Sequence, residues 1–101
     1  MILYNVTVNV EDDVVDEWIA WMKEKHIPDV LATGQFVDYK IYRLIGEIPN
    51  NGTTYSIQYF ARSMKEIDNY LANFATKLRD EHMKKFKDKH VAFRTVLESV
   101  N

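Results

Sequence analysis

The sequence of 101 residues contains no cysteine, and this absence excludes several kinds of chemistry. Without a thiol the chain can form no disulfide, ligate no iron–sulfur cluster and use no thiolate nucleophile. It also lacks any apolar run of the roughly 20 residues that a transmembrane helix needs. Its first residues alternate in polarity instead of forming a basic stretch followed by an apolar one, so we expect no signal peptide and a cytoplasmic protein.

Glycine, proline and net charge are also scarce, with three glycines, two prolines and a formal net charge of −2. So few glycines leave no glycine-rich loop of the kind that binds phosphate. A nearly neutral chain lacks the basic surface that nucleic-acid-binding domains usually present. The remaining composition, 47% hydrophobic and 28% charged, is typical of one globular domain spanning residues 1–101, without a membrane or nucleic-acid partner.

What the sequence does contain is an ordered series of periodicities. Apolar residues alternate in four segments, the expected strands, and recur at three- and four-residue steps in two others, the expected helices. The strands are expected at 2–10, 36–45, 54–61 and 91–100, and the helices at 12–25 and 64–86. Pro28 predicts a helix break near His26, and Pro-Asn-Asn-Gly at 49–52 predicts a turn. This order predicts an α+β fold, the ferredoxin-like βαββαβ sandwich with a four-stranded antiparallel sheet.

Two helices can cover only one face of such a sheet. The covered face should be the more apolar one, carrying Tyr4, Val6, Val8, Tyr39, Ile41, Tyr55, Ile57, Phe93 and Leu97. The other face is too aromatic for plain exposure to water, and we expect it to be buried against a second copy of the chain. The predicted dimer interface consists of Asn5, Thr7, Tyr42, Ser56, Gln58, Phe60, Arg94 and Val96.

An open face and an RNA-binding platform are the alternatives to that dimer. RNA-recognition domains of this topology stack bases on aromatic residues of the first and third strands, on the face away from the helices. Here Tyr4, Tyr55 and Tyr59 follow the hydrophobic face instead, which disfavours RNA binding.

His26 is the leading candidate for a catalytic residue, because it follows two tryptophans and precedes the second strand. Its ordinary pKa of about 6.5 suits proton transfer near neutral pH. The alternative is that His26 only stabilises the end of the first helix. Several tyrosine hydroxyls on the covered face need partners when buried, which indicates either a hydrogen-bonded core or a ligand pocket. The residues predicted to line that pocket are Trp21, Asp29, Tyr39, Tyr55 and Tyr59.

We expect no metal and no cofactor. His26 with Asp29, or His82 with His90, lacks a third ligand at a recognisable spacing. The end of the second expected helix is basic, which we interpret as a solvated surface that complements the helix dipole. Its basic residues are Lys77, Arg79, Lys84, Lys85, Lys87 and Lys89.

The segment WIAWMKEKHIPDVLATGQF, residues 18–36, resembles the dimeric α+β barrels, many of which follow the first helix with a His-x-Pro-x-hydrophobic turn. In that superfamily two sandwiches pack sheet on sheet. Its members include cofactor-independent monooxygenases, chlorite-dismutase-like proteins, haem-degrading enzymes and stress-response barrels. The whole chain, from MILYNVTV through HIPDVLATG, resembles a small bacterial family classed as a domain of unknown function. The resemblance implies the fold and a homodimer but no activity.

These observations favour a small dimeric barrel that binds a small flat or aromatic molecule between sheet and helices. One alternative is a non-catalytic homodimeric module for interaction or regulation. Another is an enzyme resembling cofactor-independent monooxygenases or isomerases, in which His26 moves a proton. A ligand-sized pocket beside His26 would favour binding, whereas a core with every tyrosine hydroxyl paired would favour the module.

Overall fold

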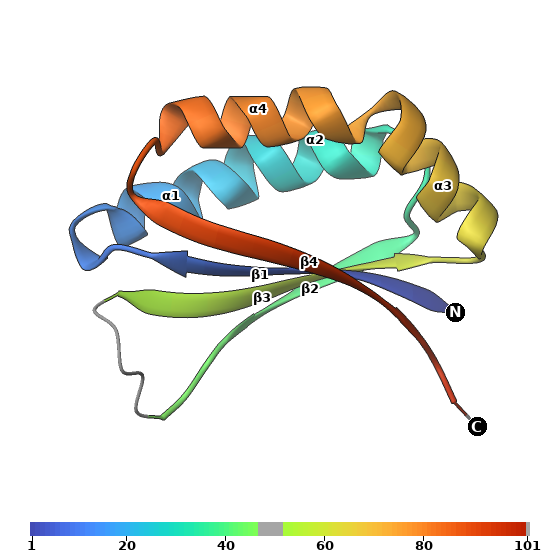
Figure 1. Cartoon of the computed structure of the whole chain (residues 1–101), viewed down its shortest axis with the longest axis horizontal. Coiled ribbons are helices and arrows are strands. Elements are labelled where there is room, and N and C mark those ends of the chain that lie inside the picture. Colours follow the sequence, from blue (N-terminus) through green and yellow to red (C-terminus); the bar gives the residue numbers. More distant parts are fainter. Residues whose placement is uncertain (47–51, 101) are drawn as a thin grey trace.

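The computed structural model describes residues 1–46 and 52–100. Four strands form one antiparallel sheet in the order β2-β3-β1-β4. All four helices lie on one face of this sheet, so the molecule has two layers (Figure 1). The elements are β1 (Ile2–Val10), α1 (Val15–Trp21), α2 (Ile27–Ala32), β2 (Asp38–Arg43), β3 (Thr53–Ala61), α3 (Met64–Asn73), α4 (Ala75–Lys85) and β4 (His90–Glu98). With α1–α2 and α3–α4 each counted as one helical unit, this is the predicted βαββαβ order.

The first helical unit does not break near His26, where Pro28 had predicted a break. A short 3₁₀ turn (Asp12–Val14) leads into α1, and a π-helical turn (Met22–His26) joins α1 to α2. The backbone N–H of Ile27 donates to the carbonyl of Met22, five residues earlier. This wider turn accommodates the ring of Pro28, which lies in the first turn of α2 and needs no hydrogen-bond acceptor there. The helical path therefore runs on to Ala32.

The second helical unit, expected to be continuous over 64–86, is divided at Phe74. There φ is −128° and ψ is −33°, outside the helical range. Figure 1 shows α3 inclined to α4 as a result. Both helices keep an apolar face toward the sheet, with Tyr70 of α3 and Leu78 of α4 buried. The bend lets the two helices contribute side chains to one region of the core.

The predicted inner face of β4 is wrong. Arg94 pairs with Val6 of β1, which puts Arg94 and Val96 on the helix-covered face of the sheet. Phe93 and Leu97 lie on the opposite face and are 60% and 49% exposed. Since β4 is an edge strand whose inner residues are at best half-buried, its more apolar side is not its inner side. The predicted interface therefore loses Arg94 and Val96.

The remaining predicted interface residues do share the face away from the helices, which we call the open face. They are Asn5, Thr7, Tyr42, Ser56, Gln58 and Phe60. The turn predicted at 49–52 lies outside the described residues except for Gly52. At Gly52 φ is 104°, and a Cβ atom would lie 2.7 Å from the carbonyl oxygen of Val10, so only glycine fits.

The hydrophobic core fills the space between the helices and the inner face of the sheet. Its largest fully buried side chains are Trp18, Ile27, Ile57, Ile67, Val8, Val10 and Val30. Among the described residues, no helix has both the length and the apolar composition to span a membrane.

Candidate functional site

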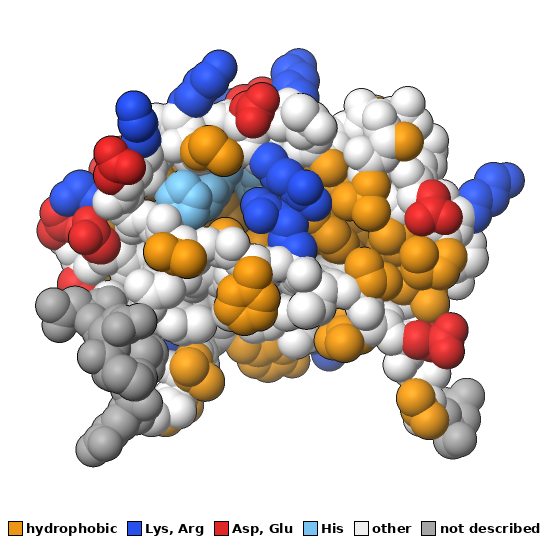
Figure 2. All heavy atoms as spheres, viewed as in Figure 1, with side chains coloured by type: hydrophobic (Ala, Val, Ile, Leu, Met, Phe, Trp, Pro, Cys, Tyr) orange, Lys and Arg blue, Asp and Glu red, His pale blue; other side chains and the backbone are white. Residues whose placement is uncertain are grey.

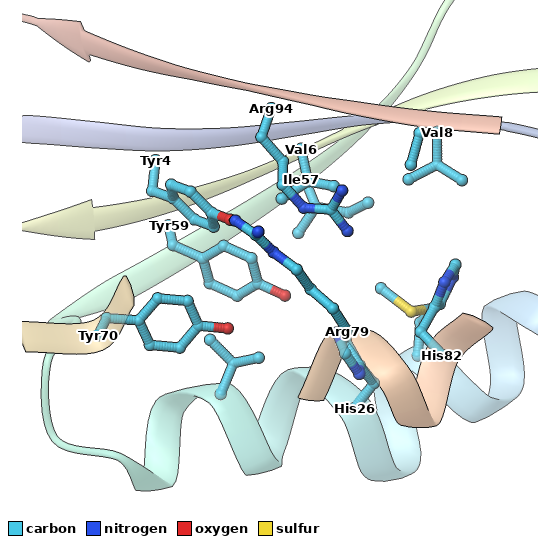
Figure 3. A pocket seen from close by; sticks show the side chains of 13 residues that line it. Tyr4, Val6, Val8, His26, Ile57, Tyr59, Tyr70, Arg79, His82 and Arg94 are labelled. Atoms are coloured by element: carbon cyan, nitrogen blue, oxygen red, sulfur yellow. The ribbon is translucent and has the colours of Figure 1, made fainter. Parts of the chain in front are cut away.

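A small cavity lies within the core, between the sheet and the helix layer (Figure 3). Its volume, measured as the space open to the centres of water molecules, is about 30 Å³. One water needs about 10–15 Å³ on that measure, so the cavity has room for about two. Its apolar lining is Val6, Val8, Met22, Val30, Ile57 and Ala92, and its polar lining is Tyr4, His26, Tyr59, Tyr70, Arg79, His82 and Arg94.

Three of the polar residues that line the cavity each have a buried side-chain atom without a hydrogen-bond partner among the described residues. These atoms are Tyr59 Oη, His26 Nδ1 and Arg79 Nε. Tyr59 is only 2% exposed, so its hydroxyl cannot turn to bulk water. Buried polar atoms in proteins nearly always have a partner, because an unpaired one costs about 1–3 kcal/mol. Three such atoms therefore belong to residues around one cavity, which makes it the candidate site.

Burial keeps both histidines of the cavity neutral at physiological pH. It lowers the pKa of His26 to about 4, against the opposing influence of Asp29 and with a smaller contribution from the positive charge of Arg94. Burial likewise lowers the pKa of His82 to about 3, reinforced by His90, His26 and Arg94. A neutral imidazole can accept a proton or a hydrogen bond, so His26 Nδ1 is available for either.

His82, in contrast, already has a structural partner. The indole N–H of Trp18 donates to His82 Nε2 over 2.8 Å, which places the imidazole hydrogen on Nδ1. The ring of His90 contacts His82 edge-on at 4.4 Å between ring centroids. His82 therefore ties α4 to α1 as well as lining the cavity.

Two arginines reach into the cavity from opposite layers, Arg79 from α4 and Arg94 from β4 (Figure 3). Arg79 Nη2 donates to the hydroxyl of Tyr4 over 2.7 Å. Arg94 makes no side-chain hydrogen bond or ion pair with any described residue. Figure 2 shows basic and histidine side chains gathered between the helix layer and β4. Both arginines are half-buried, so the cavity reaches the surface there.

The structure brings only part of the predicted site together. His26 and Tyr59 line the cavity. Trp21 does not line it but stacks on the ring of His26, with ring centroids 5.1 Å apart. Tyr39 is the cross-strand neighbour of Tyr59 but does not line the cavity, and Tyr55 packs on Trp18 instead.

Asp29 lies apart from the predicted site. Its carboxylate forms an ion pair with Lys25 at 2.7 Å and borders a separate surface depression. Asp29 is therefore not among the residues that line this cavity, and its ligand-binding role stays a prediction.

Five polar lining residues were not predicted to line the pocket: Tyr4, Tyr70, Arg79, His82 and Arg94. A signal for two of them was present. Arg79 and His82 fall three residues apart on the stripe that includes buried Ala75 and Leu78, so helical periodicity indicates that both face inward. Arg94 was hidden by the misassigned face of β4. No three metal-ligating side chains of residues 1–46 and 52–100 come together.

A family model described as Domain of unknown function (DUF4286) matches residues 1–100. The chain belongs to this family. The resemblance seen in the sequence to a domain of unknown function is thereby confirmed. No curated protein matches the sequence.

Solved structures share the DUF4286 chain's fold at low sequence identity. HapK from Hahella chejuensis has a TM-score of 0.69 at 11% identity, over 99% of this chain and 93% of that chain. A dimeric ferredoxin-like protein from an uncultured marine organism has a TM-score of 0.68 at 7% identity, over 99% of this chain and 97% of that chain. SnoaB, a cofactor-independent oxygenase from Streptomyces nogalater, has a TM-score of 0.65 at 7% identity, over 99% of this chain and 93% of that chain. At these identities the similarity shows the ferredoxin-like fold alone, as predicted.

Proposed function

We propose that the protein binds a small flat molecule in the cavity between the sheet and the helices. The observation that carries the proposal is that three residues lining one cavity each have a buried atom without a partner among the described residues: Tyr59 Oη, His26 Nδ1 and Arg79 Nε. A chain selected only for stability would pair these atoms or replace them with apolar groups. A ligand with polar edges would supply the missing hydrogen bonds.

The cavity is smaller than a drug-sized ligand, so binding requires it to open. Arg79 and Arg94 are long, half-buried side chains near its surface end. Moving Arg94 breaks no hydrogen bond within the described residues, and moving Arg79 breaks one. A ring can therefore enter between α4 and β4 by displacing these side chains, without separating the helix layer from the sheet.

Thermal denaturation against a panel of flat compounds tests this proposal, because a ligand that binds only the folded state raises the melting temperature. We expect at least one of phenol, indole, naphthol, benzamide and benzoate to give a concentration-dependent rise. Ala92→Ile should abolish that rise, since it adds three carbons to the cavity wall on a strand that tolerates a β-branched residue. Ala20→Leu, on the exposed side of α1, is the matched control and should retain the rise. No rise with any compound would contradict the proposal.

The same proposal includes a homodimer formed through the open face. Tyr42 and Phe93 on this face are 51% and 60% exposed, and no helix covers them (Figure 1). The polar residues at its centre already pair with one another. Ser56 Oγ donates to Asn5 Oδ1 over 2.6 Å, and Asn5 Nδ2 donates to Thr7 Oγ1 over 3.1 Å. Because these groups are satisfied within one chain, covering them with a second copy leaves few of them unpaired.

A stable dimer of this kind should bury about 2,000 Å² in total. The similarity to a structure described as a dimeric ferredoxin-like protein supports the arrangement. Sedimentation of the protein at micromolar concentration should give twice the chain mass of 11.9 kDa. A monomer under these conditions would contradict the dimer while leaving the cavity proposal intact.

His26 also favours a second candidate function, proton transfer on a bound substrate without a cofactor. Its Nδ1 atom is buried and has no partner among the described residues, and His26 lines the cavity. A pKa of about 4 makes the free imidazole a weak base near neutral pH, so binding stands first and catalysis second. A compound that binds and then changes its absorbance with time, in the wild type but not in His26→Gln, would support the second function.

A further inference from the structure

We propose that the ligand of this cavity is an anion, specifically a small planar carboxylate held by Arg79 and Arg94. This inference rests on the proposed function and adds the chemical class of the ligand. It follows from the charges around the cavity, from the shape of the space and from the kind of hydrogen-bond donors that remain free.

The charges around the cavity are uncompensated. Its lining contains two guanidinium groups and no carboxylate. Neither arginine forms an ion pair with a described acidic residue. Asp29, the acidic residue that influences His26, is already paired with Lys25 at 2.7 Å. Two half-buried arginines without a carboxylate partner among the described residues, beside two neutral histidines, leave a net positive charge that a ligand anion can balance.

The influence of Arg94 on its neighbours supports this assignment. Burial is the main cause of the lowered pKa values of His26 and His82 and of the raised pKa of Tyr70, and the charge of Arg94 contributes a lowering influence at all three groups. Arg94 is therefore close enough to the histidines and Tyr70 for its charge to act on them. A carboxylate placed between them would be attracted by the same charge.

The shape of the space favours a carboxylate over a phosphate. The space that is already open has room for about two waters and would admit the two oxygens of one carboxylate, whereas the four oxygens of a phosphate would need further opening at the polar end as well. Guanidinium groups bind carboxylates in a planar fork. Arg79 uses Nη2 for Tyr4 and keeps Nε free, and Arg94 has its whole fork free. The Tyr59 hydroxyl adds a third donor aimed at the same space (Figure 3).

The apolar lining indicates what the carboxylate is attached to. Val6, Ile57 and Val30 close the cavity behind the polar groups. A ligand that joins a carboxylate to a small flat apolar body matches both parts of this lining. An aromatic or unsaturated monocarboxylate is therefore the class of ligand that fits.

Matched acid and amide pairs test the inference by thermal denaturation at constant ionic strength. The pairs are formate with formamide, acetate with acetamide and benzoate with benzamide, with sodium chloride as the salt control. We expect the carboxylates, with benzoate first, to raise the melting temperature in a concentration-dependent way. Their amides, which have nearly the same shape without the charge, should give at least a tenfold weaker response.

Two arginine variants assign the effect to the site. Arg94→Met keeps the aliphatic stem, removes the charge and should abolish the response to benzoate without lowering the ligand-free melting temperature. Arg43→Met is the matched control and should respond like the wild type, because Arg43 faces the helix side from β2 but does not line the cavity.

The outcomes separate this inference from the proposed function. If benzamide and benzoate act equally, or if Arg94→Met responds like the wild type, the anion inference fails and the ligand site stands. If no carboxylate exceeds the chloride control while a neutral flat compound binds, the anion inference also fails alone. If no compound of either kind binds, both fail.

Discussion

At the scale of single residues, two tyrosines on paired strands illustrate how the cavity differs from ordinary core. Tyr4 and Tyr59 are cross-strand partners with ring centroids 6.3 Å apart, and both are almost fully buried. The hydroxyl of Tyr4 accepts a hydrogen bond from Arg79 over 2.7 Å, whereas that of Tyr59 has no partner within residues 1–46 and 52–100. One hydroxyl therefore stabilises the fold, and the other is retained at a cost.

This contrast predicts opposite effects for two identical substitutions. Tyr59→Phe should leave the free energy of unfolding within about 0.5 kcal/mol of the wild type or raise it, because it removes an unpaired polar atom. Tyr4→Phe should lower it by about 1.5–3 kcal/mol, because it removes a hydrogen bond from a charged donor. Urea denaturation of both variants without ligand measures the difference. A loss above about 1 kcal/mol in Tyr59→Phe would mean that its hydroxyl has a structural partner and would count against a ligand site.

The two neutral histidines of the cavity also predict a dependence of stability on pH. Folding lowers the pKa of His26 to about 4 and that of His82 to about 3, whereas an unfolded histidine has a pKa of about 6.5. Between these values the unfolded chain binds more protons than the folded one. The free energy of unfolding should therefore be highest above about pH 6.5 and fall as the pH falls toward 4.

The slope of that fall should approach about 1.4 kcal/mol per pH unit for each histidine. Urea denaturation between pH 7 and pH 5, above the range where most carboxylates titrate, measures it. His26→Leu should show a shallower slope than the wild type, because one of the two groups is gone. A stability that is flat over this range would show that neither histidine is buried in its neutral form.

At the scale of elements, one face of β4 belongs to the proposed ligand site and the other to the proposed dimer interface. Ala92 and Arg94 face the cavity, and Phe93 and Leu97 face away on the open face. Successive residues of one strand thus belong to two separate hypotheses, the ligand site and the dimer.

Adjacent substitutions in β4 should therefore have separable effects. Phe93→Glu places a charge on the open face and should convert the dimer to monomer in sedimentation, because an unpaired charge is costly to bury between two copies. Arg94→Met faces the other way and should leave the dimer intact. A dimer that survives Phe93→Glu but dissociates with Arg94→Met would mean that the subunits associate through a different surface.

The helical units show how an element can carry a site residue into place. The π-helical turn Met22–His26 ends at the candidate base, and the division at Phe74 separates Tyr70 from Arg79. π-Helical turns occur often at functional sites. Here the turn lets the helix pass Pro28 while His26 remains on the cavity side of the path.

At the scale of the whole molecule, the order of the elements could be predicted from the sequence, and the composition of the site could not. Alternation and helical periodicity give the βαββαβ order because the central strands and both helical units have one clearly buried face. The edge strand β4 has no clearly buried face, so its pattern predicted that Phe93 faces the helices and that Arg94 faces away from them. Because Arg94 lines the cavity from the inner face of β4, the positive charge of the cavity could not be predicted from the sequence.

Contacts between residues far apart in the sequence also limit how much of the site can be predicted from the sequence. Arg79 meets Tyr4 across 75 positions, and Trp18 meets His82 across 64. Local patterns do not contain such pairings, although they did place Tyr4, Tyr55 and Tyr59 on the face that the helices bury. Tyr59 was predicted for this reason and lines the cavity, whereas Asp29, chosen for its closeness in sequence to His26, does not.

The most direct test of the central claim, that this cavity is a ligand site, is a crystal structure. Crystals would be soaked with the compound that gives the largest rise in melting temperature. We expect ligand density between α4 and β4, with a polar ligand atom within hydrogen-bond distance of Tyr59 Oη or His26 Nδ1. If density lies elsewhere on the molecule, while the cavity stays closed and neither atom contacts a ligand, the cavity is not the ligand site.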